Sequence, residues 1–206
     1  MRNSIVVYGV AFLVFLAGTP GYSTLNPDPD EIGIYFDTGA DAVCLTTAPN
    51  VPFFAYLIIT KPSADEIWAI EFSMCTEIIG GDENLLFRLS EIWSAGFVDH
   101  GVVFDWCLDG RVIGFYEPVP WVGDNVILVQ LQYMLLADIG VEFFLGPYPV
   151  ETIEDGLPAY ADENEVVVPL RISSGDPSLP VAAVNGQCNV VSVETKTFSG
   201  LKCLYR

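Results

Sequence analysis

The chain has 206 residues, of which 27 are acidic and 8 are basic, and its formal net charge at pH 7 is −19. A surface with this charge repels nucleic acids and anionic membranes, so both classes of partner are excluded, whereas solubility, cations or a basic partner are favoured. Hydrophobic residues make up 51% of the chain and aromatic residues 13%, which excludes intrinsic disorder and is enough for one domain with a sizeable core.

The N-terminal segment has the features of a secretory signal peptide. Arg2 precedes the apolar run from Ile5 to Ala17, and small residues follow up to Ser23. We expect cleavage after Ser23, with a retained N-terminal anchor as the alternative. Cleavage would leave 27 acidic and 7 basic side chains, a formal charge of −20, and no membrane span. The protein is therefore expected to be secreted, extracellular or periplasmic.

After an acidic, Pro-rich leader over 24–31, short β-type runs fill the chain and turn residues separate them. These runs cover 32–37, 42–47, 53–60, 67–75, 102–108, 111–116, 126–137, 141–145, 166–172 and 181–184. The segment 85–90 fits either a strand or one helical turn, and 153–165 is acidic and loop-like. Regularly spaced short strands without an amphipathic helix predict an all-β, antiparallel sandwich of roughly 8–12 strands. We assign this domain to 32–185 and a hairpin-like tail to 186–206.

The stretch from Pro52 to Cys75 is expected to form the core of the sandwich. Residues 53–60 are apolar on both faces, as in a central strand, and residues 67–75 alternate, with Trp68 on the apolar face. Residues 126–137 are long enough for a helix, but their strict alternation favours a strand. Pro169 places the run 166–172 at an edge or a bulge.

The Asp109-Gly110 dipeptide gives the clearest hairpin signal. It separates the β-type runs 102–108 and 111–116, and both residues tolerate the positive φ angles of a type I′ turn. We therefore predict a two-residue hairpin turn at this point.

Catalytic residues are not indicated. His100 is the single histidine, and its neighbour Asp99 would point to the opposite face of a strand, so a Ser-His-Asp triad is not expected. Glu71, Glu117 and Glu142 lie in or beside strand-like runs and could serve a glycoside hydrolase, but no spacing selects a pair from them. Outward-facing strand carboxylates are the simpler interpretation.

Acidic turns and tryptophans are the remaining candidates for binding. Asp28 and Asp30, the turn 81–84 and the turn 162–165 could hold one structural calcium ion, although none has the EF-hand spacing. Otherwise we expect no cofactor. Trp93, Trp106 and Trp121 lie in less regular surroundings than Trp68 and could form an aromatic platform for a polysaccharide or peptide, with core packing as the alternative.

Five cysteines follow the signal segment, so at least one is free or forms an intermolecular bond. In an oxidising compartment Cys75 could bridge to Cys107 and Cys188 to Cys203. Small buried cysteines are the alternative interpretation.

Two segments carry a resemblance to known modules. Residues Ile67–Ser73 and Ile127–Tyr133 resemble an early and a late strand of the immunoglobulin-like sandwiches found in cohesin-like and carbohydrate-binding modules of secreted bacterial proteins. Ala69 stands where those modules usually have glycine, and no dockerin-contact signature is evident. The ending from Val193 to Arg206 is similar to the closing segment of uncharacterised exported bacterial proteins.

The resemblance covers residues 31–146 and implies a fold rather than a function. Together with the residue patterns, it favours a non-enzymatic binding or structural role in an extracellular or envelope assembly, with a protein or polysaccharide partner. A carbohydrate-binding module is the alternative, and a glycoside hydrolase is a third hypothesis.

Overall fold

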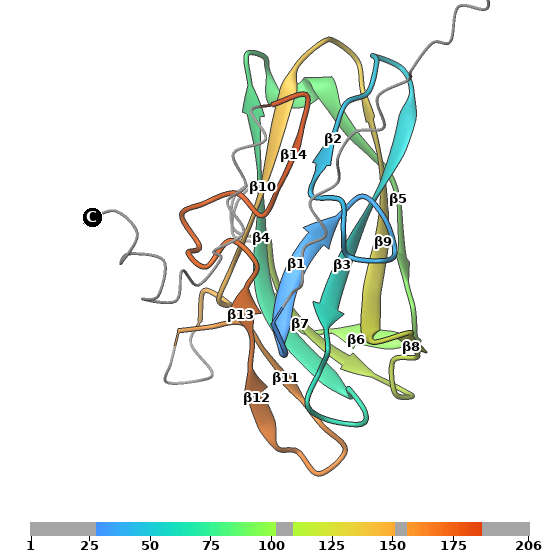
Figure 1. Cartoon of the computed structure of the whole chain (residues 1–206), viewed down its shortest axis with the longest axis vertical. Helices are drawn as coiled ribbons and strands as arrows, with labels where there is room; N and C mark the ends of the chain where they lie inside the picture. Colours follow the sequence, from blue (N-terminus) through green and yellow to red (C-terminus); the bar gives the residue numbers. More distant parts are fainter. Residues whose placement is uncertain (1–27, 102–108, 151–155, 187–206) are drawn as a thin grey trace, which may run out of the picture.

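The computed structural model describes residues 28–101, 109–150 and 156–186, which form two β-sheets packed face to face (Figure 1). The predicted all-β sandwich is confirmed, and the described residues contain a single helical turn, the 3-10 turn η1 (Glu83–Leu85). Within the same residues, no helix has both the length and the apolar character needed to cross a membrane.

Sheet A has the strand order β13-β1-β3-β9-β5, and β8 also pairs with β9. Its strands are β1 (Glu31–Tyr35), β3 (Pro52–Thr60), β5 (Leu86–Trp93), β8 (Trp121–Val122), β9 (Asn125–Leu135) and β13 (Arg171–Ile172). The run 53–60 was predicted to be central, and β3 does lie between β1 and β9. The strand prediction for 126–137 is also confirmed, because β9 spans most of that run.

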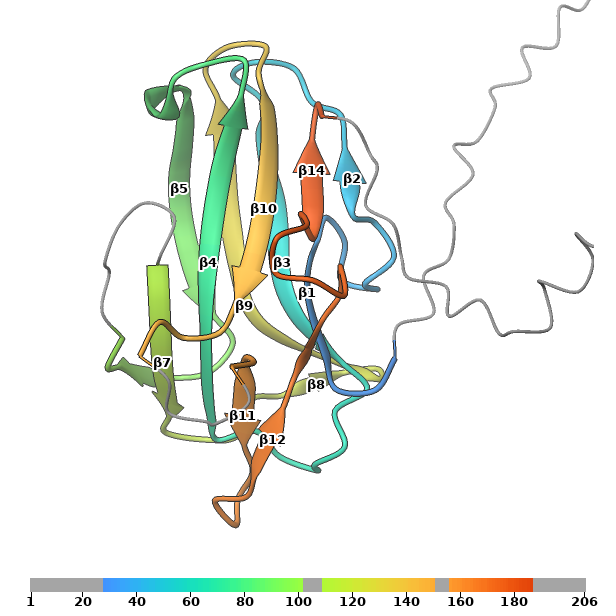
Figure 2. The ribbon, with the colours of Figure 1, turned by 90° about the vertical axis from the view of Figure 1, so that its left-hand side faces the viewer.

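Sheet B has the order β12-β11-β4-β10-β14-β2, with β7 on the other side of β4 and β6 beyond β7. Its strands are β2 (Cys44–Leu45), β4 (Ala69–Ile79), β6 (Phe97–Asp99), β7 (Asp109–Phe115), β10 (Gly140–Gly146), β11 (Ala159–Ala161), β12 (Val167–Pro169) and β14 (Ala182–Val184). Figure 2 shows β7 along the lower part of β4 and β10 along its upper part.

The number of described strands exceeds the predicted 8–12, because several segments of only two or three residues pair with the sheets as separate strands. The run 166–172 splits into β12 of sheet B and β13 of sheet A, with the fully buried Leu170 at the crossing. Pro169 lies on β12, the edge strand, as predicted. The acidic segment 153–165 contains β11, which the sequence did not indicate. Two edge pairings, β1 with β13 and β14 with β2, are parallel rather than antiparallel.

The core lies between the sheets and follows the alternation of the longest strands. Leu57 of β3 and Leu131 of β9 face Phe72 of β4 and Phe143 of β10, and all four side chains are buried. Burial of each such side chain stabilises the fold by about 1.5–3 kcal/mol. Strands β3 and β4 therefore face each other across the core, and the polar turn between them crosses from one sheet to the other.

The predicted hairpin turn at Asp109-Gly110 is wrong. Both residues belong to β7 and pair with Met74 and Ser73 of β4, and neither has a positive φ. Gly110 is needed for a different reason, because a Cβ there would lie 2.8 Å from the ring of Pro149 and 2.9 Å from that of Tyr148. The glycine thus permits the segment that follows β10 to approach β7 closely.

Several predictions fall on residues outside the described ranges. These are the signal segment 1–23, residues 24–27 of the leader, the run 102–108 and the tail from 187 onward. Cys44 and Cys75 are both disulfide-bonded. The pairings predicted from the sequence involve Cys107, Cys188 and Cys203, which lie outside the described ranges, so those pairings stay predictions.

Candidate binding face and groove

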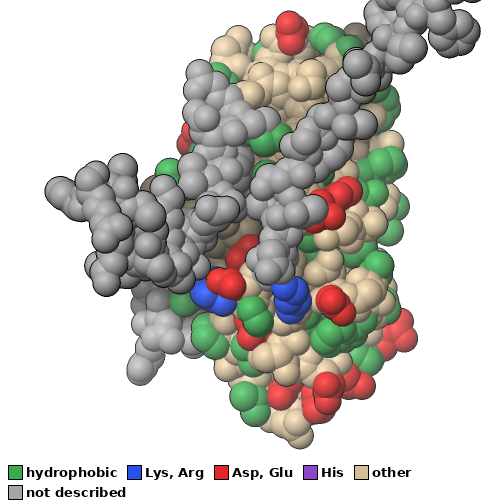
Figure 3. Space-filling model, in the orientation of Figure 1, with side chains coloured by type: hydrophobic (Ala, Val, Ile, Leu, Met, Phe, Trp, Pro, Cys, Tyr) green, Lys and Arg blue, Asp and Glu red, His purple; other side chains and the backbone are tan. Residues whose placement is uncertain are grey.

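Over β5, β9 and the adjoining start of β3, no described segment covers the outer face of sheet A, and several large apolar side chains are exposed there. In the register, the side chains of Gln130 and Gln132 on β9 lie between residues of β3 and β5. We call this surface the bare half; its exposed apolar side chains are Phe54 (41% exposed), Phe87 (47%), Leu89 (46%) and Ile92 (56%). Figure 3 shows hydrophobic side chains, in green, along the right-hand side of the molecule, where these strands run.

The other half of the same sheet face is covered by the chain itself. Tyr35 of β1 and Ile58 of β3 point outward, yet both are buried, because the segment 37–43 folds over them and inserts Ala40. Asp37 holds this segment in place, since its carboxylate accepts hydrogen bonds from the backbone N–H groups of Asp41 (3.0 Å) and Ala42 (3.2 Å). We call this surface the covered half.

A glycine allows the covered half to close. The ring of Tyr35 lies over Gly33, where an added Cβ would be 2.7 Å from Cε2 of the tyrosine. Burial, followed by the nearby charge of Glu31, raises the pKa of the Tyr35 phenol far above its ordinary value of 10. The covered half is therefore a small second core outside the sandwich.

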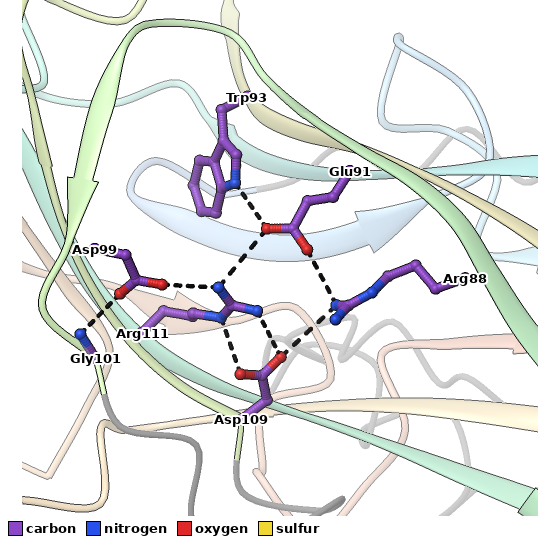
Figure 4. A network of polar contacts seen from close by, with 7 residues as sticks. All are labelled: Arg88, Glu91, Trp93, Asp99, Gly101, Asp109 and Arg111. Carbon is purple, nitrogen blue, oxygen red and sulfur yellow. Dashed lines mark hydrogen bonds and ion pairs between the residues drawn. The ribbon is translucent and has the colours of Figure 1, made fainter.

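Strand β5, at the edge of the bare half, is joined to sheet B by a network of charged side chains (Figure 4). The guanidinium group of Arg111 on β7 donates two hydrogen bonds to Asp109 (2.9 and 3.0 Å) and one to Asp99 (2.7 Å). Glu91 of β5 lies 3.7 Å from Arg111 and 3.2 Å from Arg88. The network spans both sheets at their open edge.

The charged side chains of β5 point inward, which is unusual for a sandwich strand. Arg88 and Glu91 pair with Tyr133 and Leu131, whose side chains belong to the core. A bulge at Arg88 to Ser90 brings them into this orientation while Leu89 faces solvent. Inward charges and a bulge are devices that protect an edge strand from pairing with another sheet.

The network changes the titration of two groups. Burial lowers the pKa of Arg111, but its hydrogen bonds to Asp109 and Asp99 and the charges of Asp109 and Glu91 outweigh that effect, so the pKa is raised. Burial raises the pKa of the neighbouring Tyr133 to about 12, and Arg88 opposes that rise. Arg111 is therefore a permanent cation at this edge, and the phenol of Tyr133 is neutral.

A groove of about 730 Å³ lies where β5 turns into β6, next to the bare half. Aromatic side chains and two carboxylates line it, and the lining residues are Glu91, Ile92, Trp93, Ser94, Ala95, Gly96, Phe97, Tyr116 and Glu117. Because Ile92 belongs to both features, the groove is continuous with the bare half.

The structure separates the tryptophans proposed as a platform. Trp93 lines the groove and is half-buried, its ring tilted by 40° against Phe97 and its Nε1–H bonded to Glu91 at 2.8 Å. Trp121 lies on β8, 41% exposed, and donates to the backbone oxygen of Asp65. Trp106 lies outside the described residues. Binding by these tryptophans stays a prediction.

The three glutamates proposed for hydrolysis are dispersed. Glu71 lies on β4 and pairs with Val112 of β7 and Ala159 of β11. Glu142 lies on β10 and pairs with Glu77, which is six residues beyond Glu71 on β4. Six residues correspond to about 20 Å, more than twice the widest separation of a hydrolytic pair. Glu117 lies in the groove. The exposed His100 donates its backbone N–H to Val112, while Asp99 binds Arg111.

The acidic turns proposed for calcium use their carboxylates locally. Asp82 accepts hydrogen bonds from Asn84, which lower the pKa of its carboxyl group, and Asp162 accepts from the backbone of Asn164 and Val166. Asp28 pairs with Arg171 at 3.0 Å. In the part of the chain that the structure describes, no three His, Cys, Asp or Glu side chains are grouped to hold a metal ion.

Sequence reasoning named Trp93 and Glu117 but missed the bare half, the network and Tyr116. The signal for the bare half was present, because Phe87, Leu89 and Ile92 occur in a run that also contains charged residues. The bulge in β5 made this signal hard to read, because a bulge breaks the strict alternation by which the face of a strand is identified.

No protein-family model matches the chain, and no curated protein matches it. Solved structures do: a type II cohesin domain from the cellulosome of Acetivibrio cellulolyticus has a TM-score of 0.49 and 9% identity, and covers 77% of this chain and 96% of its own. The sixth cohesin of scaffoldin B from the same organism, solved with a Cel5 dockerin mutant, has a TM-score of 0.48 and 12% identity. It covers 75% of this chain and 96% of its own.

A non-cellulosomal cohesin from the archaeon Archaeoglobus fulgidus has a TM-score of 0.42 and 9% identity, and covers 69% of this chain and 84% of its own. All three of these structures are cohesin modules, and each has a TM-score below 0.5 and an identity of 12% or less to this chain. The partners of those modules are not transferred to this chain.

Proposed function

We propose that this chain is a non-enzymatic binding module of an extracellular or envelope assembly, and that the bare half is the surface that binds a protein partner. The observation that carries this proposal is the row of exposed apolar side chains at Phe54, Phe87, Leu89 and Ile92 on one sheet face. Several large apolar side chains exposed on one face are typical of an interaction site.

The partner should present an apolar strip with basic residues at its ends. The centre of the bare half is uncharged, with the amides of Gln130 and Gln132 between the apolar side chains. Exposed carboxylates flank it, from Asp82 and Glu83 before β5 to Glu117 beyond Ile92. Charges at the rim of an interface select the partner and accelerate association.

The extracellular location rests on the N-terminal segment. A positively charged start, an apolar run and small residues before Thr24 support export with cleavage after Ser23. N-terminal sequencing of the protein recovered from its host would test this. A chain that still begins at Met1 would indicate a retained anchor.

The carbohydrate-binding alternative has less support. A polysaccharide platform needs rings that share a plane, but Trp93 is tilted by 40° to Phe97 and by 52° to Phe115. Trp121 belongs to a different part of sheet A, on β8.

The protein-binding proposal is tested with matched surface variants. Phe87 and Leu179 are both 47% exposed, but Leu179 lies in the turn before β14 and outside the bare half. The purified protein and the variants Phe87→Ser and Leu179→Ser are used to capture partners from the medium of the native host, and the affinity of each captured protein is then measured by calorimetry. We expect Phe87→Ser to weaken a true partner by about tenfold or more.

Two results would contradict the proposal. One is equal affinity of the two variants for every captured protein. The other is a concentration-dependent dimer, seen by sedimentation and lost in Phe87→Ser, since the bare half would then bind a second copy of the chain.

A further inference from the structure

The groove beside the bare half combines an exposed aromatic ring with a carboxylate. Tyr116 is 70% exposed, the highest value among the exposed large hydrophobic residues. Its backbone N–H donates to the oxygen of Gly96 at 2.8 Å, and its ring rests on that glycine, where an added Cβ would be 3.1 Å from Cδ2. The ring is thus held at the rim of the groove.

Both charged side chains that line the groove are carboxylates. Of its two carboxylates, Glu91 already binds Trp93, Arg88 and Arg111. The side chain of Glu117 is exposed and makes no hydrogen bond or ion pair with the described residues, and no basic residue lines the groove. The overall charge of −19 adds to the attraction for a cation.

We propose that the groove binds an arginine side chain of the protein partner, an inference that rests on the proposed function of the bare half. The guanidinium plane stacks on the ring of Tyr116 and donates hydrogen bonds to the carboxylate of Glu117. Arginine suits this site better than lysine, because its planar group combines stacking with a two-pronged contact to a carboxylate. The rest of the partner lies on the adjoining bare half.

A sugar fits the groove less well. Of the aromatic residues that line the groove, Trp93 and Phe97 are half-buried and Tyr116 is exposed, so a sugar finds only one accessible ring there. The indole N–H of Trp93 is already donated to Glu91, so it is not free to bind a hydroxyl group.

The test uses short peptides and does not require the partner. The peptide acetyl-Gly-Arg-Gly-amide is titrated into the 15N-labelled protein, and the indole N–H of Trp93 and the backbone N–H of Tyr116 report binding by NMR. The citrulline peptide, which has the same shape without the charge, and a lysine peptide are compared with it. We expect millimolar binding of the arginine peptide, several-fold weaker binding of the lysine peptide and no response to citrulline. Binding should weaken in 0.5 M salt.

Variants at the groove complete the test. Glu117→Gln and Tyr116→Leu should each weaken the arginine peptide by about fivefold or more, whereas Glu163→Gln, an exposed carboxylate between β11 and β12, should leave it unchanged. Equal binding of the arginine and citrulline peptides, no binding up to 50 mM, or binding of cello- or xylo-oligosaccharides at the same signals would overturn the inference.

The two proposals fail separately. Peptide binding at the groove without any partner on the bare half removes the proposed function alone. A partner that needs Phe87 but is indifferent to Glu117→Gln and Tyr116→Leu removes the arginine site alone.

Discussion

The two halves of the outer face of sheet A carry similar apolar side chains, which are buried on one half and exposed on the other. On the covered half, Ile58 is fully buried because the segment 37–43 lies over it. On the bare half, Ile92 is 56% exposed on the same face of the same sheet. The difference shows that the chain buries one half of the face for its own stability, whereas large apolar side chains on the other half stay exposed.

The hydrogen bonds of the covering segment explain why the cover stops where it does. Asp37 closes the segment over β1 and β3, and Asn125 ties it to the start of β9 through the oxygen of Gly39. No described segment continues over β5. Among the described residues, the cover thus ends at the boundary between β1 and β3 on one side and β5 on the other.

The largest expected effect comes from matched truncations on the two halves. Ile58→Ala removes a fully buried side chain and should lower the free energy of unfolding by about 2–5 kcal/mol. Ile92→Ala should change it by no more than about 0.5 kcal/mol, because the side chain is already solvated. Denaturant unfolding of both variants measures the difference. Equal losses would mean that the bare half is covered in solution.

The next effect concerns the edge beside the bare half. Arg111→Met removes the counter-charge of Asp99 and Asp109 and should lower the free energy of unfolding by about 2–3 kcal/mol. Hydrogen exchange should accelerate in β5 and β7 more than in β1 and β3, because the network joins the former pair across the sandwich. Arg111→Lys should recover only part of the stability, since lysine cannot form the two-pronged contact to Asp109. Uniform acceleration across the sheets would contradict this role.

The smallest expected effect is a change in how the stability of the protein depends on pH, caused by a carboxyl group beside the covered half. Burial raises the pKa of Glu31, on the outer face of β1, above its ordinary value of 4.5. Because the folded state holds the proton more tightly than the unfolded state, stability falls as the pH rises through the folded pKa. Glu31→Gln should therefore stabilise the protein at pH 7 and lose that advantage toward pH 4, as measured by thermal unfolding. A constant difference between the two pH values would remove burial of this carboxyl group as the cause.

The sequence predicted the long strands well. The run 126–137, whose alternation indicated a strand, became β9, and the run 53–60, which is apolar on both faces, became β3 in a central position. It failed at Asp109-Gly110, where a strong local turn signal was overridden by pairing with β4 and by the close approach of Tyr148. It also failed to find the bare half, since the bulge in β5 hides the row of exposed apolar side chains.

The sequence by itself determined the all-β architecture, because alternating apolar residues can be buried together only in strands that pack face to face. It also determined the acidic character and named Trp93 and Glu117 as candidates. Only the tertiary structure decided which half of sheet A is covered, that Arg88 and Glu91 point inward, and that Tyr116 and Glu117 line a groove together with residues 91–97. Alternation distinguishes the two faces of a strand, but whether an outward face is solvated depends on segments that are distant in the chain.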